Sequence, residues 1–191
     1  MTLTTEISMG ILFAFAPFIA FALVDRALGS VDGLLAGAAI SIALVLRDAL
    51  SGRVPKILEI GSLVLFAGIA LYVITIGANF SVMAVRLLVD GGLLLVVLIS
   101  LAAGVPFTLQ YAREQVPPEF WNAPEFKRTN VVITSVWAAA FAVITGADAV
   151  LVFMSEVPRQ VGVLTIVAAL VFATKFTGWY PKQKHTPASG S

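Results

Sequence analysis

The chain has 191 residues, of which 59% are hydrophobic and 12% are charged, and its mean hydropathy is +0.98. Soluble domains carry about 25% charged residues, so this composition indicates a protein that folds in lipid. The formal net charge of +1 gives no reason to expect nucleic-acid binding. Disulfides and thiolate chemistry are excluded because cysteine is absent, and the one histidine, His185, falls in a polar tail at 185–191.

Six apolar runs are long enough to cross a membrane as helices. Such a helix needs about 20 mostly apolar residues, and in lipid its backbone groups must pair within the segment. We predict an all-α membrane bundle of about six transmembrane helices, forming a single domain over residues 1–184. The first run is expected to be retained, since no Lys or Arg precedes it as in a signal peptide. The predicted spans are 8–24, 28–46, 57–76, 80–105, 131–154 and 161–180.

Basic residues in the loops favour one orientation of these spans. Cytoplasmic loops carry an excess of Lys and Arg, so the side richer in them is predicted to be cytoplasmic. Both termini and the 106–128 loop fall on that side. Its basic residues are Arg47, Arg53, Lys56, Arg113, Lys127, Arg128, Lys175, Lys182 and Lys184, against Arg26, Arg86 and Arg159 on the other side.

Three ionisable residues inside the predicted spans are candidates for a polar cluster: Arg86, Asp90 and Asp148. Such residues cost several kcal/mol in lipid unless they are paired or hydrated. Arg86 and Asp90 are four residues apart, which places them on one helix face within pairing reach. One interpretation is a structural ion pair. The alternative is a small transporter or channel whose path uses all three residues.

Two further charged residues lie near the predicted cytoplasmic ends of the spans, Glu59 in the third and Lys175 in the sixth. Long side chains at such positions can extend to the membrane surface. We expect this arrangement for both residues rather than a proton relay, which needs a chain of such groups deeper in the bilayer.

The longest loop, 106–128, places aromatic residues among charges and prolines, including Tyr111, Trp121 and Phe126. Aromatic residues with polar groups favour the headgroup layer, so one interpretation is an interfacial segment. The other is a docking surface for a partner protein. The motif Phe-Thr-x-x-Tyr-x-Arg/Lys starts in this loop, at 107–113, and occurs again at 176–182. Duplication of a two-helix hairpin and convergence on interfacial chemistry both explain the repeat.

Motifs of common membrane and soluble enzymes are absent. The sequence contains no phosphate-binding Gly loop followed by Lys-Ser/Thr, no His-Glu-x-x-His and no Gly-x-Ser-x-Gly. We therefore assign no catalytic, cofactor-binding or metal-binding residue, and expect a protein that is not an enzyme and needs no cofactor.

Several segments together resemble the intracellular septation protein A family, also described as inner membrane-spanning proteins of bacteria. Phe-Ala-Phe-Ala-Pro-Phe at 13–18 is similar to the opening of that family. Lys-Ile-Leu at 56–58 begins a span after a short basic loop, as in the family. Pro-Phe-Thr at 106–108 ends a span before a long amphipathic loop, where the family has Pro-Leu-Ile.

The strongest likeness follows that loop. Trp-Ala-Ala-Ala-Phe at 137–141 resembles the Trp-Ala-x-x-Phe of the family, Gly-Ala-Asp at 146–148 resembles its Gly-x-Asn step, and 161–178 resembles its closing helix. The chain departs from the pattern at Asp148, where asparagine is usual, and at Thr134, where an asparagine precedes the tryptophan. The resemblance implies a multi-pass inner-membrane protein of septation and envelope maintenance, with the lipid bilayer and cell-division or envelope-synthesis membrane proteins as partners. It implies no catalytic residue.

Overall fold

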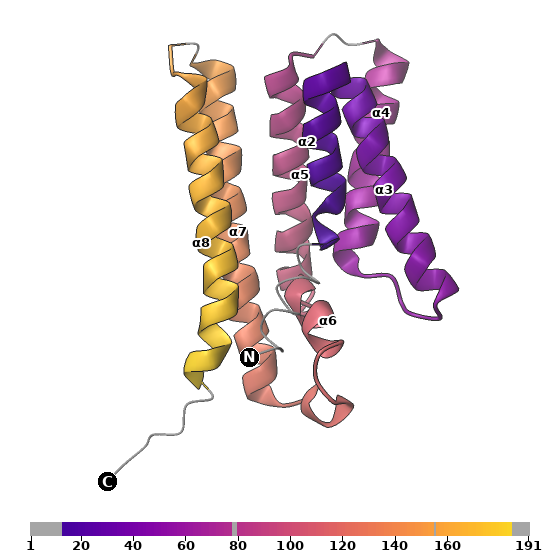
Figure 1. The fold of residues 1–191 in the computed structure, drawn as a ribbon, viewed down its shortest axis with the longest axis vertical. Helices are drawn as coiled ribbons and strands as arrows, with labels where there is room; N and C mark the ends of the chain where they lie inside the picture. The colour runs from indigo at the N-terminus through magenta and orange to yellow at the C-terminus, as the bar shows by residue number, and fades with distance from the viewer. Residues whose placement is uncertain (1–12, 78–79, 155, 185–191) are drawn as a thin grey trace.

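The computed structural model describes residues 13–77, 80–154 and 156–184 (Figure 1). Regular structure in these ranges is entirely helical, with seven α-helices, one 3-10 turn and no strand. The predicted all-α bundle is therefore confirmed. The elements are α2 (Ala16–Leu28), α3 (Ser30–Leu50), α4 (Ile57–Ile76), α5 (Val82–Ala102), α6 (Phe107–Arg113), η1 (Pro118–Phe120), α7 (Pro124–Phe153) and α8 (Arg159–Lys184).

Five of these helices are long and apolar enough to cross a membrane: α3, α4, α5, α7 and α8. The chain is a multi-pass membrane protein. The predicted span 57–76 coincides with α4, whereas α7 begins at Pro124, seven residues before the predicted 131. Proline suits the first turn of a helix because its missing N–H has no partner there. At 30 residues α7 is about 45 Å long, which exceeds the hydrocarbon thickness of about 30 Å.

The first predicted span, 8–24, is described only from residue 13 onward; residues 8–12 and the predicted tail 185–191 lie outside the described ranges. Its described part continues beyond 24 and forms α2, which ends at Leu28. Gly29 alone connects α2 to α3 and has a positive φ of 109°, a conformation that favours glycine. The two helices therefore form a tight hairpin.

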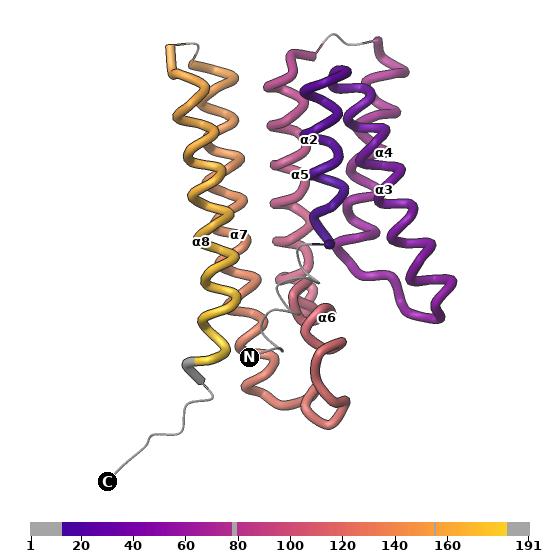
Figure 2. The backbone as a smooth tube through the Cα atoms, in the orientation of Figure 1, coloured from indigo at the N-terminus to yellow at the C-terminus, as the bar shows by residue number. Residues whose placement is uncertain are grey.

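The helices α2, α3, α4 and α5 gather in one group, and the pair α7 and α8 stands beside them (Figure 1). The two groups meet where α5 packs against α7, while α8 packs mainly on α7. The tube in Figure 2 shows the α3–α4 loop, α6 and η1 at one end, and the α2–α3, α4–α5 and α7–α8 connections at the other. We call the first, which contains residues 47–56 and 106–128, the basic end, and the second the opposite end.

Aromatic side chains fill the centre of the bundle. Trp137 of α7 is buried among Phe15, Phe107 and Phe141, with the Phe15 ring stacked on it at a centroid distance of 5.0 Å. A second buried cluster surrounds Phe66 of α4. Packing of this kind holds helices together in lipid, where no hydrophobic driving force acts between them.

Candidate functional site

Arg86 of α5 pairs with Asp25 of α2. Its Nη2 atom lies 2.8 Å from Asp25 Oδ2 and its Nε atom 3.1 Å from the same oxygen. Ser30 Oγ donates a hydrogen bond of 2.7 Å to the other carboxylate oxygen, and the Asp25 side chain is fully buried. The predicted pairing of Arg86 with Asp90 is therefore wrong. The prediction ended the first span at 24, whereas α2 continues to Leu28 and carries Asp25 inside the bundle.

Asp90, the other partner considered for Arg86, faces Asp148 of α7 instead, within reach of a side-chain hydrogen bond. Asp148 is only 2% exposed, and its Oδ2 atom is buried without a hydrogen-bond donor. The two helices are in contact at this level, since a Cβ atom on Gly91 of α5 would lie 3.6 Å from Thr145 Cγ2 of α7. The structure thus brings two members of the predicted cluster together and gives the third a different partner.

The Arg86–Asp25 pair can be tested by double-mutant cycles on unfolding in detergent. Asp25→Ala leaves Arg86 without its buried partner, so the coupling free energy between the Asp25→Ala and Arg86→Ala changes should be about 1–3 kcal/mol. The matched cycle of Arg86→Ala with Asp90→Ala should give a smaller value. A larger coupling for Asp90 than for Asp25 would show that the pairing is assigned to the wrong residue.

A buried group of charges at the basic end was not anticipated from the sequence. Lys56 Nζ lies 2.6 Å from Asp48 Oδ2, 3.0 Å from Glu114 Oε1 and 3.5 Å from Glu59 Oε1. The side chains of Lys56, Asp48 and Glu59 are 5%, 0% and 1% exposed. We call Lys56, Asp48, Glu59 and Glu114 together the Lys56 cluster. Glu59 was expected to extend to the surface and is instead buried, whereas Lys175 is exposed on α8.

The Lys56 cluster joins three segments of the chain. Asp48 comes from the last turn of α3, Glu59 from the first turn of α4, and Glu114 follows α6 directly. The backbone N–H of Ile57, at the start of α4, donates a 2.8 Å hydrogen bond to Gln110 Oε1 of α6. Lys56 Nζ also sits 5.1 Å above the ring of Tyr111, at cation–π distance. The cluster therefore fixes the α3–α4 loop against α6.

Carboxylates hold the Lys56 ammonium in its charged form. Burial by itself lowers the pKa of Lys56, but hydrogen bonds to Asp48 and Glu114 and the charges of Glu59 and Glu114 outweigh it, so the pKa is raised above the ordinary lysine value. Burial, with the nearby charge of Glu59, also raises the pKa of the Tyr111 hydroxyl, which keeps it neutral. The sequence contained a signal for this cluster, since Asp48 near the end of α3 and Lys56 before α4 carry opposite charges. Their contact, however, requires the α3–α4 loop to fold back, which the sequence does not show.

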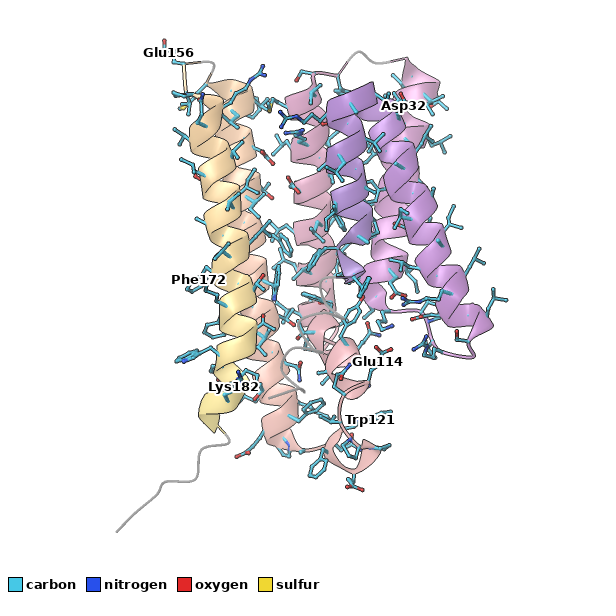
Figure 3. The ribbon with its side chains drawn as sticks, viewed as in Figure 1. Asp32, Glu114, Trp121, Glu156, Phe172 and Lys182 are labelled. Atoms are coloured by element: carbon cyan, nitrogen blue, oxygen red, sulfur yellow. The ribbon has the colours of Figure 1, made fainter. Side chains whose placement is uncertain are left out.

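The structure gives the three candidate docking residues different positions. Tyr111 is 4% exposed and packs beneath Lys56, so it is not available at the surface. Trp121 is half-buried, and its Nε1 atom donates hydrogen bonds to the carbonyl oxygens of Arg113 and Val116 at 3.2 and 3.1 Å. Phe126 is half-buried, whereas Phe120, the residue before Trp121, is 53% exposed. Figure 3 shows Trp121 and Glu114 at the basic end, far from Asp32 at the opposite end.

Both copies of the Phe-Thr-x-x-Tyr-x-Arg/Lys motif dock on α7. In the first copy, the Thr108 hydroxyl shares a 2.7 Å hydrogen bond with Thr134 and donates to the carbonyl oxygen of Asn130 at 3.1 Å. In the second, Thr177 accepts a 3.0 Å hydrogen bond from Trp137 Nε1. The repeated motif therefore has a repeated structural role, attaching α6 and α8 to neighbouring turns of α7.

Comparisons with protein-family models, curated proteins and solved structures find no match for this chain. In the described ranges, no group of three or more His, Cys, Asp or Glu side chains is placed to hold a metal ion. What the geometry offers is a pair of facing carboxyl groups between α5 and α7, a braced ionic cluster at the basic end, and a surface segment around η1.

Proposed function

We propose that this chain is a bacterial inner-membrane protein of the septation and cell-envelope maintenance type, which acts through membrane-protein partners rather than by catalysis. The family resemblance supports the type of process, most strongly at 137–141. The observation that carries partner binding is the surface around η1, where an exposed aromatic residue stands on a braced segment.

That segment is held from within. The Thr108 hydroxyl ties α6 to α7, the Lys56 cluster ties the end of α6 to α3 and α4, and Trp121 closes the turn after α6 through its two carbonyl contacts. Phe120 remains outside this framework. The exposed charged residues around it are Glu119, Glu125, Lys127 and Arg128. An exposed aromatic side chain on a preorganised segment, surrounded by charges, is typical of a protein interface.

The orientation is part of this proposal. The excess of Lys and Arg at the basic end supports a cytoplasmic location for that end and for both termini. The partner would then be met at the cytoplasmic surface of the membrane. Partners of fitting chemistry are cell-division or envelope-synthesis membrane proteins whose cytoplasmic segments offer an apolar pocket bordered by charges of both signs.

Complementation tests the proposal. In a strain that lacks this protein and has an envelope or division defect, Phe120→Ala is expected to lose rescue at wild-type membrane level. Truncating an anchor aromatic costs about 2 kcal/mol or more of binding free energy, which is a loss of about thirtyfold or more in affinity. Val54→Ala, which alters another exposed apolar residue at the basic end, should rescue fully. Full rescue by Phe120→Ala would contradict partner docking at this surface.

The orientation serves as the control for that experiment. The chain has no cysteine, so Phe120→Cys can be labelled without background. A membrane-impermeant thiol reagent should reach it only after the membrane is opened. Labelling in intact spheroplasts would place the surface outside the cytoplasm, and cytoplasmic partners would then be the wrong class.

A second candidate function is a small transporter or channel that uses Arg86, Asp90 and Asp148. It is favoured because Asp90 of α5 and Asp148 of α7 face each other. Ionisable groups buried at membrane depth often line ion or proton pathways. The same complementation assay separates the two functions. Loss of rescue by Asp90→Asn combined with Asp148→Asn, together with full rescue by Phe120→Ala, would favour transport.

A further inference from the structure

Asp90 of α5, which is partly buried, faces the fully buried Asp148 of α7. Asp90 lies eight residues after the start of α5 at Val82, which is about 12 Å along the helix at 1.5 Å per residue. Asp148 lies five residues before the end of α7 at Phe153, or about 8 Å. Both distances are measured from the opposite end of the bundle. The carboxyl groups therefore lie more than one helical turn inside the ends of α5 and α7.

Two buried side-chain atoms at this level have no hydrogen-bond partner. Asp148 Oδ2 is buried without a hydrogen-bond partner, and so is the hydroxyl oxygen of Thr145, one turn earlier on the same face of α7. Buried polar atoms are normally hydrogen-bonded, and leaving one without a partner costs about 1–3 kcal/mol. The unpartnered Asp148 oxygen points to something the site binds.

The charged groups around the pair do not supply the missing donor. Arg86 lies one turn from Asp90 on α5, but Asp25 of α2 engages its guanidinium. On α4 the titratable groups are Glu59, at the basic end, and the exposed Tyr72; on α8, Arg159 and Lys175 are exposed. Asp148 is therefore the ionisable group that Asp90 reaches for a hydrogen bond, whereas Arg86 acts on Asp90 through its charge alone.

Two carboxylates in contact in a low-dielectric site repel strongly, so both do not ionise together. A proton placed between them turns that repulsion into a short, charge-assisted hydrogen bond. A metal ion fits less well, because Ca²⁺ takes 6–8 oxygen ligands and Mg²⁺ near-octahedral coordination, while two carboxyl groups and one hydroxyl meet here. A cavity of about 240 Å³ lies between α7 and α8. Neither Asp90 nor Asp148 lines it, so it is separate from this site.

We propose that Asp90 and Asp148 form a proton-binding site that holds one shared proton between α5 and α7 at neutral pH. The proton is then a ligand of this membrane protein. The proposal does not rest on partner docking at Phe120. It also links the two groups of helices, since α5 and α7 form their main contact. Release of the proton would leave two like charges across that contact and weaken it.

The site is testable on the purified full chain in lipid nanodiscs. Infrared difference spectra should show a protonated-carboxyl C=O band at neutral pH that disappears on alkalinisation. Stability should fall over the same range, because the folded state binds more protons than the unfolded state and so loses stability as pH rises. Asp90→Asn and Asp148→Asn should each remove the band. Each variant should keep a Tm near wild type at neutral pH, because the amide can donate to the remaining carboxylate.

Controls and a second measurement decide the alternatives. Asp32→Asn, which changes an exposed acid at the same end, should keep both the band and the pH dependence. In the wild type, a hydrophobic carbodiimide, which reacts with protonated carboxyl groups, should modify Asp90 or Asp148 at neutral pH and less at alkaline pH; this needs no variant to fold. Absence of that modification, or a band unchanged in both Asn variants, would overturn the proposal. A Tm raised by Na⁺ over choline at equal ionic strength, in the wild type alone, would overturn it in favour of a cation site.

Discussion

Replacing Lys56 with methionine is expected to destabilise the folded protein by about 3–5 kcal/mol, the usual cost of removing one partner from a buried ionic group. The change preserves length and apolar volume but removes the buried cation that Asp48 and Glu59 share, and both of these carboxylates are essentially inaccessible. Arg47, which reaches Asp48 at 2.9 Å and Glu59 at 3.6 Å, is half exposed and replaces only part of the lost interaction. The α3–α4 loop should detach from α6 first.

Chemical unfolding in mild detergent, followed by tryptophan fluorescence, measures this loss. The matched control is Arg53→Met, since Arg53 approaches the same Asp48 at 3.8 Å but is 52% exposed; a surface pair of this kind contributes about 0–1 kcal/mol. A Lys56→Met variant as stable as Arg53→Met would show that the cluster is not a structural brace.

The same cluster sets a direction for pH dependence. The raised pKa of Lys56 means that its stabilising charge is fully present at neutral pH, below the ordinary lysine value. The contribution is lost only as pH rises through the higher pKa of the folded state. The wild type should therefore lose more stability than Lys56→Met in that strongly alkaline range.

Truncation of Trp137 to alanine is expected to cost about 3–5 kcal/mol, as for large aromatic residues in a packed core. The ring contacts Phe15, Phe107 and Phe141, and its Nε1 atom donates to Thr177 of α8. The Trp137 side chain of α7 thus contacts α6, α8 and the residue Phe15 that precedes α2. Trp137→Phe should cost less than the alanine change, because it keeps an aromatic ring and loses mainly the hydrogen bond, worth about 0.5–1.5 kcal/mol.

Thermal unfolding by circular dichroism compares these variants with Trp179→Ala, which removes a 53% exposed tryptophan of α8. Surface substitutions usually change stability by about 0.5 kcal/mol or less. Equal losses for Trp137→Ala and Trp179→Ala would contradict the assignment of Trp137 as the packing centre of the bundle.

The sequence by itself determined the class of the protein and the position of most helices. Long apolar runs must become helices in lipid because no water is present to satisfy the backbone, and this constraint acts within each segment. The span 57–76 was therefore located to the residue. The predicted helix ends were less accurate where polar residues extend a helix beyond its apolar part, as in α7, which begins at Pro124. A helix can continue into water with polar residues, so the apolar run marks only the part of it that lies in lipid.

Only the tertiary structure decided the partners of the charged residues. Arg86 pairs with Asp25, which is 61 positions away in sequence, rather than with Asp90 on its own helix. Asp90 then faces Asp148, and Lys56 gathers carboxylates from the end of α3, the start of α4 and the end of α6. Spacing along one helix shows which groups can meet, but the free energy of a buried charge depends on every helix that surrounds it. That surrounding is set by how α2, α5 and α7 pack, and helix packing is a property of the whole bundle.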